Sequence, residues 1–210
     1  MENSILSALS EQLKKPLPGF EAHKLMFPRG NASKDLLNIP ETARKSAVAI
    51  LLFEEEDSLY SIVIKRSEYN GTHSGQIAFP GGKFEDEDEN LIQTALRECF
   101  EEIGVEPEEL HHLGSLSDVY TVVSSFLISP QVFHWKNPHT GFKPSEREVA
   151  AVYRLSLNEL IQSEAVQHFD VSVNNGLVLK AVPHFVVGEI RIWGATAVIL
   201  SELKYILRQL

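Results

Sequence analysis

Residues 82–105 read GKFEDEDENLIQTALRECFEEIGV, an acidic loop that runs into a strongly patterned segment. Apolar residues recur in that segment at three- and four-residue spacing, which marks one buried stripe of a helix: Ile92, Ala95, Leu96, Cys99 and Ile103. Gly104 is a natural C-terminal stop, and Pro107 follows it. The pattern predicts a helix that ends near residue 103 and packs one face against a sheet.

The opposite face of this helix carries three carboxylates. Glu98, Glu101 and Glu102 stand at i, i+3 and i+4, so they share that face. Like charges ~6 Å apart repel by about 3 kcal/mol per pair at an effective dielectric near 20, and by less than about 1 kcal/mol in water. A solvated helix face would therefore cost little, whereas the same face in a cleft needs a cation such as Mg²⁺.

Gly82, the acidic loop and the run from Arg97 to Val105 together resemble the Nudix box. In that box a glutamate follows the glycine after five residues, and the Arg-Glu pair follows after seven more. Here Asp88 stands at the first spacing, eight residues separate it from Arg97, and Glu89 fits the second spacing instead. The resemblance leaves the loop carboxylate open between Asp88 and Glu89, with Glu85 as a weaker alternative.

The resemblance implies a catalytic set of Arg97, Glu98, Glu101 and Glu102. The three glutamates would bind Mg²⁺ or Mn²⁺, with Glu98 and Glu102 weighted most. Arg97 would brace the box, because it lies one helical turn from Glu101 and an arginine fork can hold a carboxylate. The alternative for Arg97 is an ordinary surface pair worth a few tenths of a kcal/mol. Cys99 faces the buried stripe, which argues against a thiol nucleophile, because an apolar setting raises the thiol pKa and blocks access.

A second motif lies upstream, at residues 65–67 and 73–82, and resembles the extra motif of Nudix coenzyme A diphosphatases. It departs from that motif at Ile64, where a threonine is expected, and at Asn70-Gly71. Cations beside a glycine-containing loop would suit a multiply charged phosphate ligand. His73 is equally well explained as a hydrogen-bonded loop histidine. The resemblance implies these substrate contacts: Lys65, Arg66, His73, Ser74, Gly75, Phe79, Gly81, Gly82 and Lys83.

The implied activity is Mg²⁺- or Mn²⁺-dependent hydrolysis of the diphosphate bond of coenzyme A or its thioesters, giving 3′,5′-ADP and (acyl-)4′-phosphopantetheine. Two alternatives stay open. One is a Nudix diphosphatase for ADP-ribose, NADH or another nucleoside diphosphate derivative, and the other is a non-catalytic nucleotide-sensing module. The general base is undecided among a box glutamate and four further carboxylates: Asp88, Glu89, Glu146 and Glu148.

The fold implied by the resemblance is α/β, a Nudix α/β/α sandwich with a mixed sheet and flanking helices. We divide the chain into residues 1–40, a helix and extended lead-in packed on the domain, and residues 41–210, the hydrolase domain. Apolar periodicity predicts helices at the N-terminus, near residues 158–163 and after Gly194. Trp193 is expected in the core. Strands are predicted at residues 47–53, 59–65, 119–128, 149–155 and 176–182.

Composition limits the classes of binding partner that we expect. The 210 residues carry a net charge of -10, which disfavours binding along a nucleic-acid backbone. No apolar run approaches the roughly 20 residues that span a bilayer. A single cysteine and no apparent secretory signal favour the cytoplasm. The expected partner is a small nucleoside diphosphate-linked substrate, and the sequence does not decide the oligomeric state.

Overall fold

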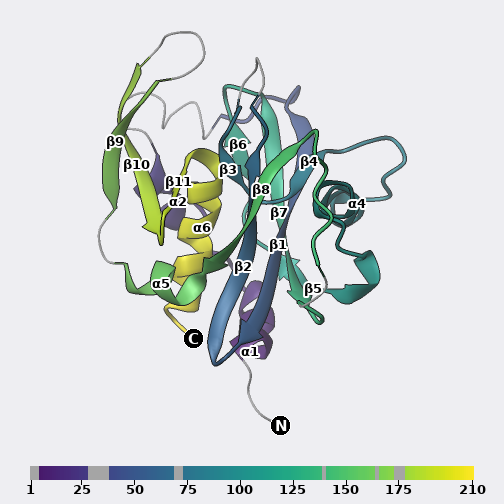
Figure 1. Cartoon of the computed structure of the whole chain (residues 1–210). Coiled ribbons are helices and arrows are strands. Elements are labelled where there is room, and N and C mark those ends of the chain that lie inside the picture. Colours follow the sequence, from purple (N-terminus) through teal and green to yellow (C-terminus); the bar gives the residue numbers. More distant parts are fainter. Residues whose placement is uncertain (1–4, 28–37, 69–72, 139–140, 164–165, 173–177) are drawn as a thin grey trace.

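The computed structural model describes residues 5–27, 38–68, 73–138, 141–163, 166–172 and 178–210 (Figure 1). The helices are α1 (Ile5–Leu13), α2 (Phe20–His23), η1 (Lys24–Met26), α4 (Leu91–Ile103), η2 (Pro107–Glu109), α5 (Leu157–Gln162) and α6 (Gly194–Leu207). The main sheet contains β1 (Arg44–Glu55), β2 (Ser58–Arg66), β3 (Ile77–Ala78), β4 (Gly81–Lys83), β5 (Leu110–Ser115), β6 (Val119–Thr121), β7 (Phe126–Trp135) and β8 (Val149–Ser156). A second sheet contains β9 (Gln167–Ser172), β10 (Val178–Val187) and β11 (Ile190–Trp193).

The main sheet is mixed, as predicted. Its central order is β3-β2-β1-β7-β5, with β4 also on β1, β6 on β7 and β8 on β2. β1 and β7 are parallel, and the other pairs are antiparallel. The strands predicted at residues 47–53 and 59–65 are confirmed as parts of β1 and β2, which form a hairpin that closes through Glu56 and Asp57, both with positive φ.

Helices cover both faces of this sheet (Figure 1). α4 packs against β1 and β7 on one side, where Ala95, Cys99 and Ile103 enter an apolar cluster. α1, α5 and α6 contribute to a second apolar cluster on the other side, with the small sheet beyond it. The arrangement confirms the α/β/α sandwich and places the carboxylate face of α4 away from the larger core.

Both ends of α4 are fixed by the residues that the sequence provides. The side chain of Asn90 accepts hydrogen bonds from the N–H groups of Ile92 and Gln93, at 2.9 and 3.1 Å. Gly104 adopts a left-handed φ of 70°, and its N–H donates to the Phe100 carbonyl at 2.8 Å. These caps set the register of the helix and therefore the direction of its glutamates.

The N-terminal segment is more helical than expected. Leu6, Leu9 and Leu13 of α1 are buried against the larger core, as the apolar spacing predicted. The lead-in was expected to be extended, but residues 20–26 form α2 and η1. These short helices bring donors to Glu202 of α6, which explains why the segment does not run straight.

The strand predicted over residues 119–128 is wrong. A turn at residues 122–125 separates β6 from β7, and the hydroxyl of Thr121 lies 2.7 Å from that of Ser124. Val123 is 76% exposed, so its apolar side chain misled the prediction. Of the strand expected at residues 176–182, residues 176 and 177 lie outside the described residues, and β10 runs from Val178 to Val187.

The second sheet was not foreseen beyond that one strand. β9 and β11 pair with β10 on either side, and Phe185 and Ile192 point into the larger core. Trp193, expected in the core, is only half-buried, and its ring lies 6.3 Å from that of Phe169. The sheet therefore has an apolar inner face and a second, aromatic face.

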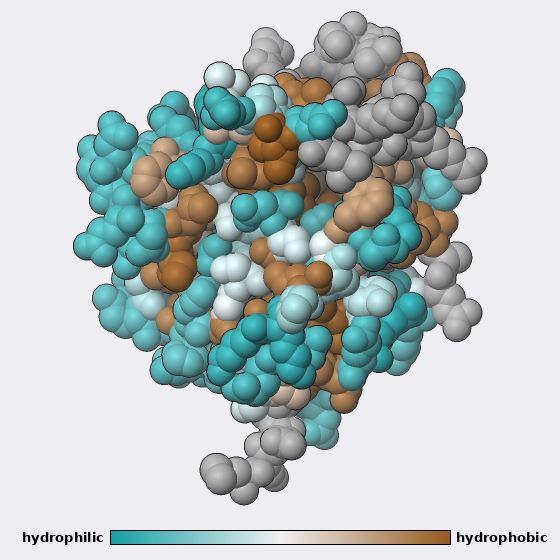
Figure 2. Space-filling model, turned by 180° about the vertical axis from the view of Figure 1, so that it is seen from behind, coloured by the Kyte–Doolittle hydropathy of each residue, from teal (hydrophilic) through white to brown (hydrophobic). Residues whose placement is uncertain are grey.

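No helix in the described ranges is long and apolar enough to cross a membrane. Seen from behind, the surface is largely hydrophilic, with smaller apolar patches between the polar side chains (Figure 2).

Candidate active site

A glycine strand lies directly against the carboxylate face of α4. Gly81 has a φ of 157°, and a Cβ there would come within 2.3 Å of the Ala47 carbonyl oxygen. A Cβ on Gly82 would lie 2.3 Å from Oε1 of Glu98. Gly81 therefore requires glycine, because a Cβ would collide with the β1 backbone, whereas a Cβ at Gly82 would force the Glu98 side chain to turn away.

Glu102 is the buried end of this face. It is 2% exposed, and its Oε2 accepts a hydrogen bond from the Gly81 N–H at 2.9 Å. Nη1 of Arg66 stands 3.7 Å from its Oε1. Burial raises the pKa of Glu102 to about 7, although the Gly81 N–H and the Arg66 charge act in the other direction. The carboxylate is thus held with little compensation for its charge.

Glu98 lies one turn before Glu102, beside Gly82. Its side chain is 13% exposed, and burial raises its pKa despite the nearby guanidinium of Arg97. The charge of Glu148 acts on both Glu98 and Glu102, which brings three carboxylates into electrostatic contact. Such mutual repulsion is relieved by a bound cation.

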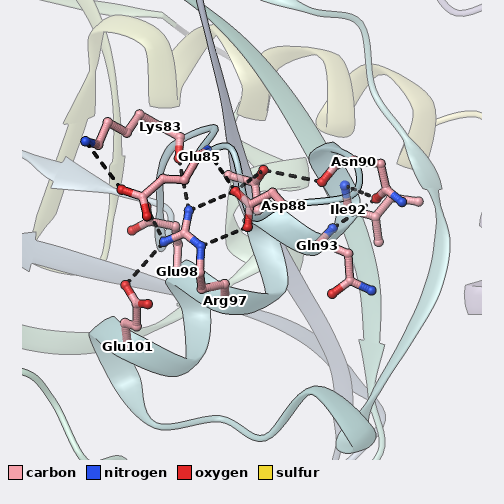
Figure 3. A network of polar contacts seen from close by, with 10 residues as sticks. Lys83, Glu85, Asp88, Asn90, Ile92, Gln93, Arg97, Glu98 and Glu101 are labelled. Atoms are coloured by element: carbon pink, nitrogen blue, oxygen red, sulfur yellow. Dashed lines mark hydrogen bonds and ion pairs between the residues drawn. The ribbon is translucent and has the colours of Figure 1, made fainter.

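Arg97 is held mainly by Asp88 (Figure 3). Nε and Nη2 of Arg97 donate to Oδ1 and Oδ2 of Asp88 at 2.9 and 3.0 Å, and Nη2 also reaches the Lys83 carbonyl at 3.0 Å. The expected contact with Glu101 is present but longer, at 3.3 Å. The two-pronged bond to Asp88 fixes the guanidinium plane, and Nη1 then donates to Glu98 at 3.0 Å.

This network shows which loop carboxylate contacts Arg97. The hydrogen bonds from Arg97 lower the pKa of Asp88 to about 2, and the Thr94 hydroxyl and the Glu85 N–H also donate to it. Glu89 is exposed. Asp88 is therefore the partner of Arg97. The sequence left this position undecided between Asp88 and Glu89, and Asp88 holds the guanidinium in place.

Glu101 differs from its two neighbours. Its side chain is 52% exposed and contacts Arg97, on the solvent side of the network (Figure 3). As the side chains stand, no three acidic, histidine or cysteine groups of the described residues form a metal-binding set. Glu98 and Glu102 nevertheless suit a hard divalent cation, because they are oxygen donors with raised pKa values and few hydrogen-bond donors.

The remaining candidates for the general base lie in the loop after β7. This loop is tied to the end of α4, since Ser145 N donates to the Glu102 carbonyl at 2.9 Å. Glu146 and Glu148 are both exposed. The charge of Glu148 acts on the half-buried Glu98 and the buried Glu102, whereas both carboxylate oxygens of Asp88 accept hydrogen bonds from Arg97.

The upstream motif forms the edge of the site. Lys65 and Arg66 end β2, and His73 is half-buried with a left-handed φ of 67° and Nδ1 3.1 Å from Oε1 of Gln76. Ser74 and Gly75 are half-buried in the same turn. Residues 69–72, which include the Asn70-Gly71 departure, lie outside the described residues.

Among the expected substrate contacts, Phe79 needs revision and Lys83 stays a prediction. Phe79 is buried in the larger core, so its ring packs beneath the glycine strand instead of facing a ligand. Lys83 is exposed and pairs with Glu85 at 3.3 Å, near the Arg97 network. Phe79 lies between β3 and β4, outside both strands, and its ring joins the larger apolar cluster because burial removes the aromatic surface from water.

Sequence reasoning missed the supports of the box. Asn90 caps α4, and the buried hydroxyl of Thr94 holds Asp88 at 2.9 Å. The signal for Asn90 was present, because Asn directly before a periodic apolar segment is a preferred N-cap. Nothing in the pattern distinguished Thr94 from an ordinary surface residue of the helix.

The α4 face carries the buried Glu102 and the half-buried Glu98, is braced by Arg97 and lies against a glycine strand, so it offers oxygen donors of the kind that hydrolases of phosphate anhydrides use for a divalent cation. The chain matches the NUDIX domain family over residues 43–173, and it belongs to this family. Nudix hydrolases generally use divalent metal ions.

Several known proteins are similar to this chain. The Nudix hydrolase NudL of Enterobacter sp. (strain 638) is 34% identical over 178 residues, which cover 83% of this chain and 86% of that protein. The mitochondrial coenzyme A diphosphatase NUDT8 of Mus musculus is 33% identical over 136 residues, or 65% of this chain and 64% of that protein. A crystal structure of a C. elegans Ap4A hydrolase binary complex overlaps 57% of this chain and 84% of that chain, with 17% identity and a TM-score of 0.47.

Proposed function

We propose that this protein hydrolyses the diphosphate bond of coenzyme A or its thioesters in the presence of Mg²⁺ or Mn²⁺, giving 3′,5′-ADP and (acyl-)4′-phosphopantetheine. The observation that carries the hydrolase chemistry is Glu102, a buried carboxylate with a raised pKa beside the Gly81–Gly82 strand. The upstream motif and the resemblance to a coenzyme A diphosphatase over 65% of the chain support the substrate.

Glu98 and Glu102 would hold the cation, and Glu101 would join them from the solvent side. A bound divalent ion supplies charge neutralisation for the diphosphate and lowers the pKa of an attacking water. Arg97, locked by Asp88, orients Glu98. Lys65 and Arg66 at the end of β2 would contact phosphate oxygens, and Glu148, whose charge acts on Glu98 and Glu102, would accept the proton of the water.

The organisation of the chain is part of the proposal. Residues 1–40 would form a segment packed on the hydrolase domain of residues 41–210, because the α1 leucines share one core with α6. We place the activity in the cytoplasm. Fractionation of cells would test that location against the mitochondrion, which the NUDT8 relative carries in its name.

The proposal is tested by incubating the protein with Mg²⁺ and, separately, coenzyme A, acetyl-coenzyme A, ADP-ribose and NADH, and by separating the products chromatographically. We expect 3′,5′-ADP from the first two substrates. Turnover of ADP-ribose or NADH alone would refute the substrate. Binding of any of these nucleotides without turnover would instead favour a sensing module.

Two variants with the same Glu→Gln substitution, one at a buried and one at an exposed residue, test the role of Glu102 in this assay. Glu102→Gln removes the buried carboxylate, whereas Glu106→Gln makes the same change at an exposed residue just beyond α4. We expect turnover to be lost in the first variant and kept in the second. Equal turnover in both would contradict the assignment of Glu102.

A further inference from the structure

Arg66 stands in an unusual position beside Glu102. Its Nη1 lies 3.7 Å from Oε1 of the buried carboxylate, close enough for charge attraction and too far for a hydrogen bond. Its Nε is shielded from solvent and has no hydrogen-bond partner among the described residues. The guanidinium thus compensates Glu102 electrostatically while its own donors stay incompletely used.

The backbone fixes this position. β2 and β8 pair regularly until Lys65↔Ala151, and Arg66 then pairs with Val149, so β8 carries one extra residue there. Such a bulge redirects side chains near the end of a ladder. The Arg66 N–H donates to the Gln76 carbonyl at 3.0 Å, and the Ser67 N–H donates to the Glu148 carbonyl at 2.9 Å. The backbone pairing at the end of β2 therefore positions Arg66 beside Glu102.

The same carboxylate cannot serve two cations equally well. A divalent ion on Glu98 and Glu102 would lie within a few ångströms of the Arg66 guanidinium. A doubly charged ion and a guanidinium at such a separation repel each other strongly in a partly buried site if neither moves. The flexible arginine side chain relieves that repulsion by turning away from Glu102.

We propose that Arg66 is an exchangeable counter-ion. In the metal-free enzyme it partly neutralises Glu102, and on cation binding it leaves that carboxylate and donates to the diphosphate of the substrate. A guanidinium fork suits this second partner, because it can bind two phosphate oxygens at once. The inference rests on the proposed function, since it requires a cation on Glu102 and a diphosphate beside it.

The exchange couples the two ligands. Cation binding must displace Arg66, and this displacement lowers the affinity for the cation. The displaced guanidinium then raises the affinity for the diphosphate. Removal of the arginine charge therefore has opposite effects on the two ligands. A residue that only supported the fold would weaken both, and a residue that only contacted substrate would leave the cation unaffected.

The test compares the wild-type protein with Arg66→Met by isothermal titration calorimetry at pH 8.5, where Glu102 is ionised. Without any phosphate ligand, we expect Arg66→Met to bind Mg²⁺ at least threefold more tightly than the wild type. With saturating Mg²⁺, we expect it to bind methylenediphosphonate, a diphosphate that resists hydrolysis, at least tenfold more weakly. Circular dichroism checks that the variant is folded.

Two further variants separate charge from shape. Arg154→Met removes an arginine from β8 that pairs with Glu55, and it should leave both affinities within twofold of the wild type. Arg66→Lys keeps the charge and should leave the Mg²⁺ affinity within twofold. If Arg66→Lys tightened Mg²⁺ binding as much as Arg66→Met, charge would not be the cause and the inference would be refuted.

The wild-type titration distinguishes the two levels of the proposal. A wild type that binds no Mg²⁺ would overturn both the metal-dependent function and the role of Arg66. A wild type that binds Mg²⁺, with an Arg66→Met variant of equal or weaker Mg²⁺ affinity, would overturn the role of Arg66 alone. Unchanged methylenediphosphonate affinity in Arg66→Met would likewise exclude the transfer to the diphosphate.

Discussion

Two buried glutamates on opposite sides of the main sheet are treated very differently by the chain. Glu102 of α4 is 2% exposed, and Glu202 of α6 is 0% exposed. Glu202 accepts hydrogen bonds from the N–H groups of Gly19 and Ser117 at 2.7 and 2.8 Å, and from the Ser117 hydroxyl at 2.7 Å. His23 adds a fourth contact at 3.2 Å.

The pKa values of the two residues diverge for this reason. Burial would raise the pKa of Glu202, but the bonds from His23 and Ser117 outweigh burial and lower it. At Glu102 one N–H and a distant guanidinium do not outweigh burial, and the pKa rises to about 7. Burial alone therefore does not mark a functional acid. A buried acid that accepts too few hydrogen bonds to offset its burial is a candidate functional acid.

The largest effect that would test this comparison is on catalysis. Glu102→Gln should lower kcat for coenzyme A about 1000-fold, or about 4 kcal/mol, because it removes a charge that would hold the cation. Its free energy of unfolding without metal should not fall. Steady-state kinetics and urea unfolding measure the two quantities, and a variant that is both destabilised and active would reverse the assignment.

Glu202→Gln should show the opposite pattern. An amide in this position would turn an NH₂ group toward donors that now face a carboxylate oxygen, so we expect a loss of about 3 kcal/mol of unfolding free energy. The kcat/KM of the folded fraction should stay within threefold. Urea unfolding provides the first value, and a loss below about 1 kcal/mol would mean that the four contacts contribute little.

The pH dependence of stability gives a third, smaller contrast. In EDTA, the folded pKa of Glu102 lies near 7 and its ordinary value is 4.5, so this residue lowers stability as pH rises through that window, with the full cost present above about pH 7. The stability of Glu102→Gln relative to the wild type should therefore increase by roughly 2.5 to 3 kcal/mol between pH 4.5 and 8. Thermal unfolding across this range measures the difference, and a flat difference would contradict the raised pKa.

Asp88 gives a third case for this comparison, because it is a buried acid on the same side of the sheet as Glu102 but accepts several hydrogen bonds. Arg97 lowers its pKa to about 2, so its stabilising effect is present above about pH 4 and is lost as pH falls toward 2. Asp88→Asn should cost about 1 to 2 kcal/mol of unfolding free energy at pH 7. Glu87→Gln in the same loop, at an exposed residue, is the control and should change little.

The elements that the sequence predicted well are those with local causes. α4 and α6 show apolar periodicity, and α4 has a cap at each end, so neither needed knowledge of the rest of the fold. The small sheet was largely missed because its strands are short and mix exposed with buried residues. The turn at residues 122–125 was missed because Val122 and Val123 are apolar yet exposed.

For the site, the sequence placed three glutamates on one face but could not rank their burial. Glu98 and Glu102 are one turn apart and face β4, whereas Glu101 lies about 100° away from Glu102 and faces solvent. Likewise, the spacing could not choose between Asp88 and Glu89. That choice depends on how the loop folds back to Arg97, which only three-dimensional structure reveals.

The parallel pairing of β1 with β7 also has a consequence for biosynthesis. Ile50 pairs with Val132, 82 positions later in the chain. At synthesis rates of roughly 5 to 20 residues per second, the apolar strand β1 waits about 4 to 16 s for this neighbour to leave the ribosome. Until then the β1–β2 hairpin has one open edge of unpaired backbone N–H and C=O groups, in a strand rich in Val, Ile, Leu and Phe. Chaperone capture of nascent chains should therefore concentrate on lengths between the end of β2 and the end of β7.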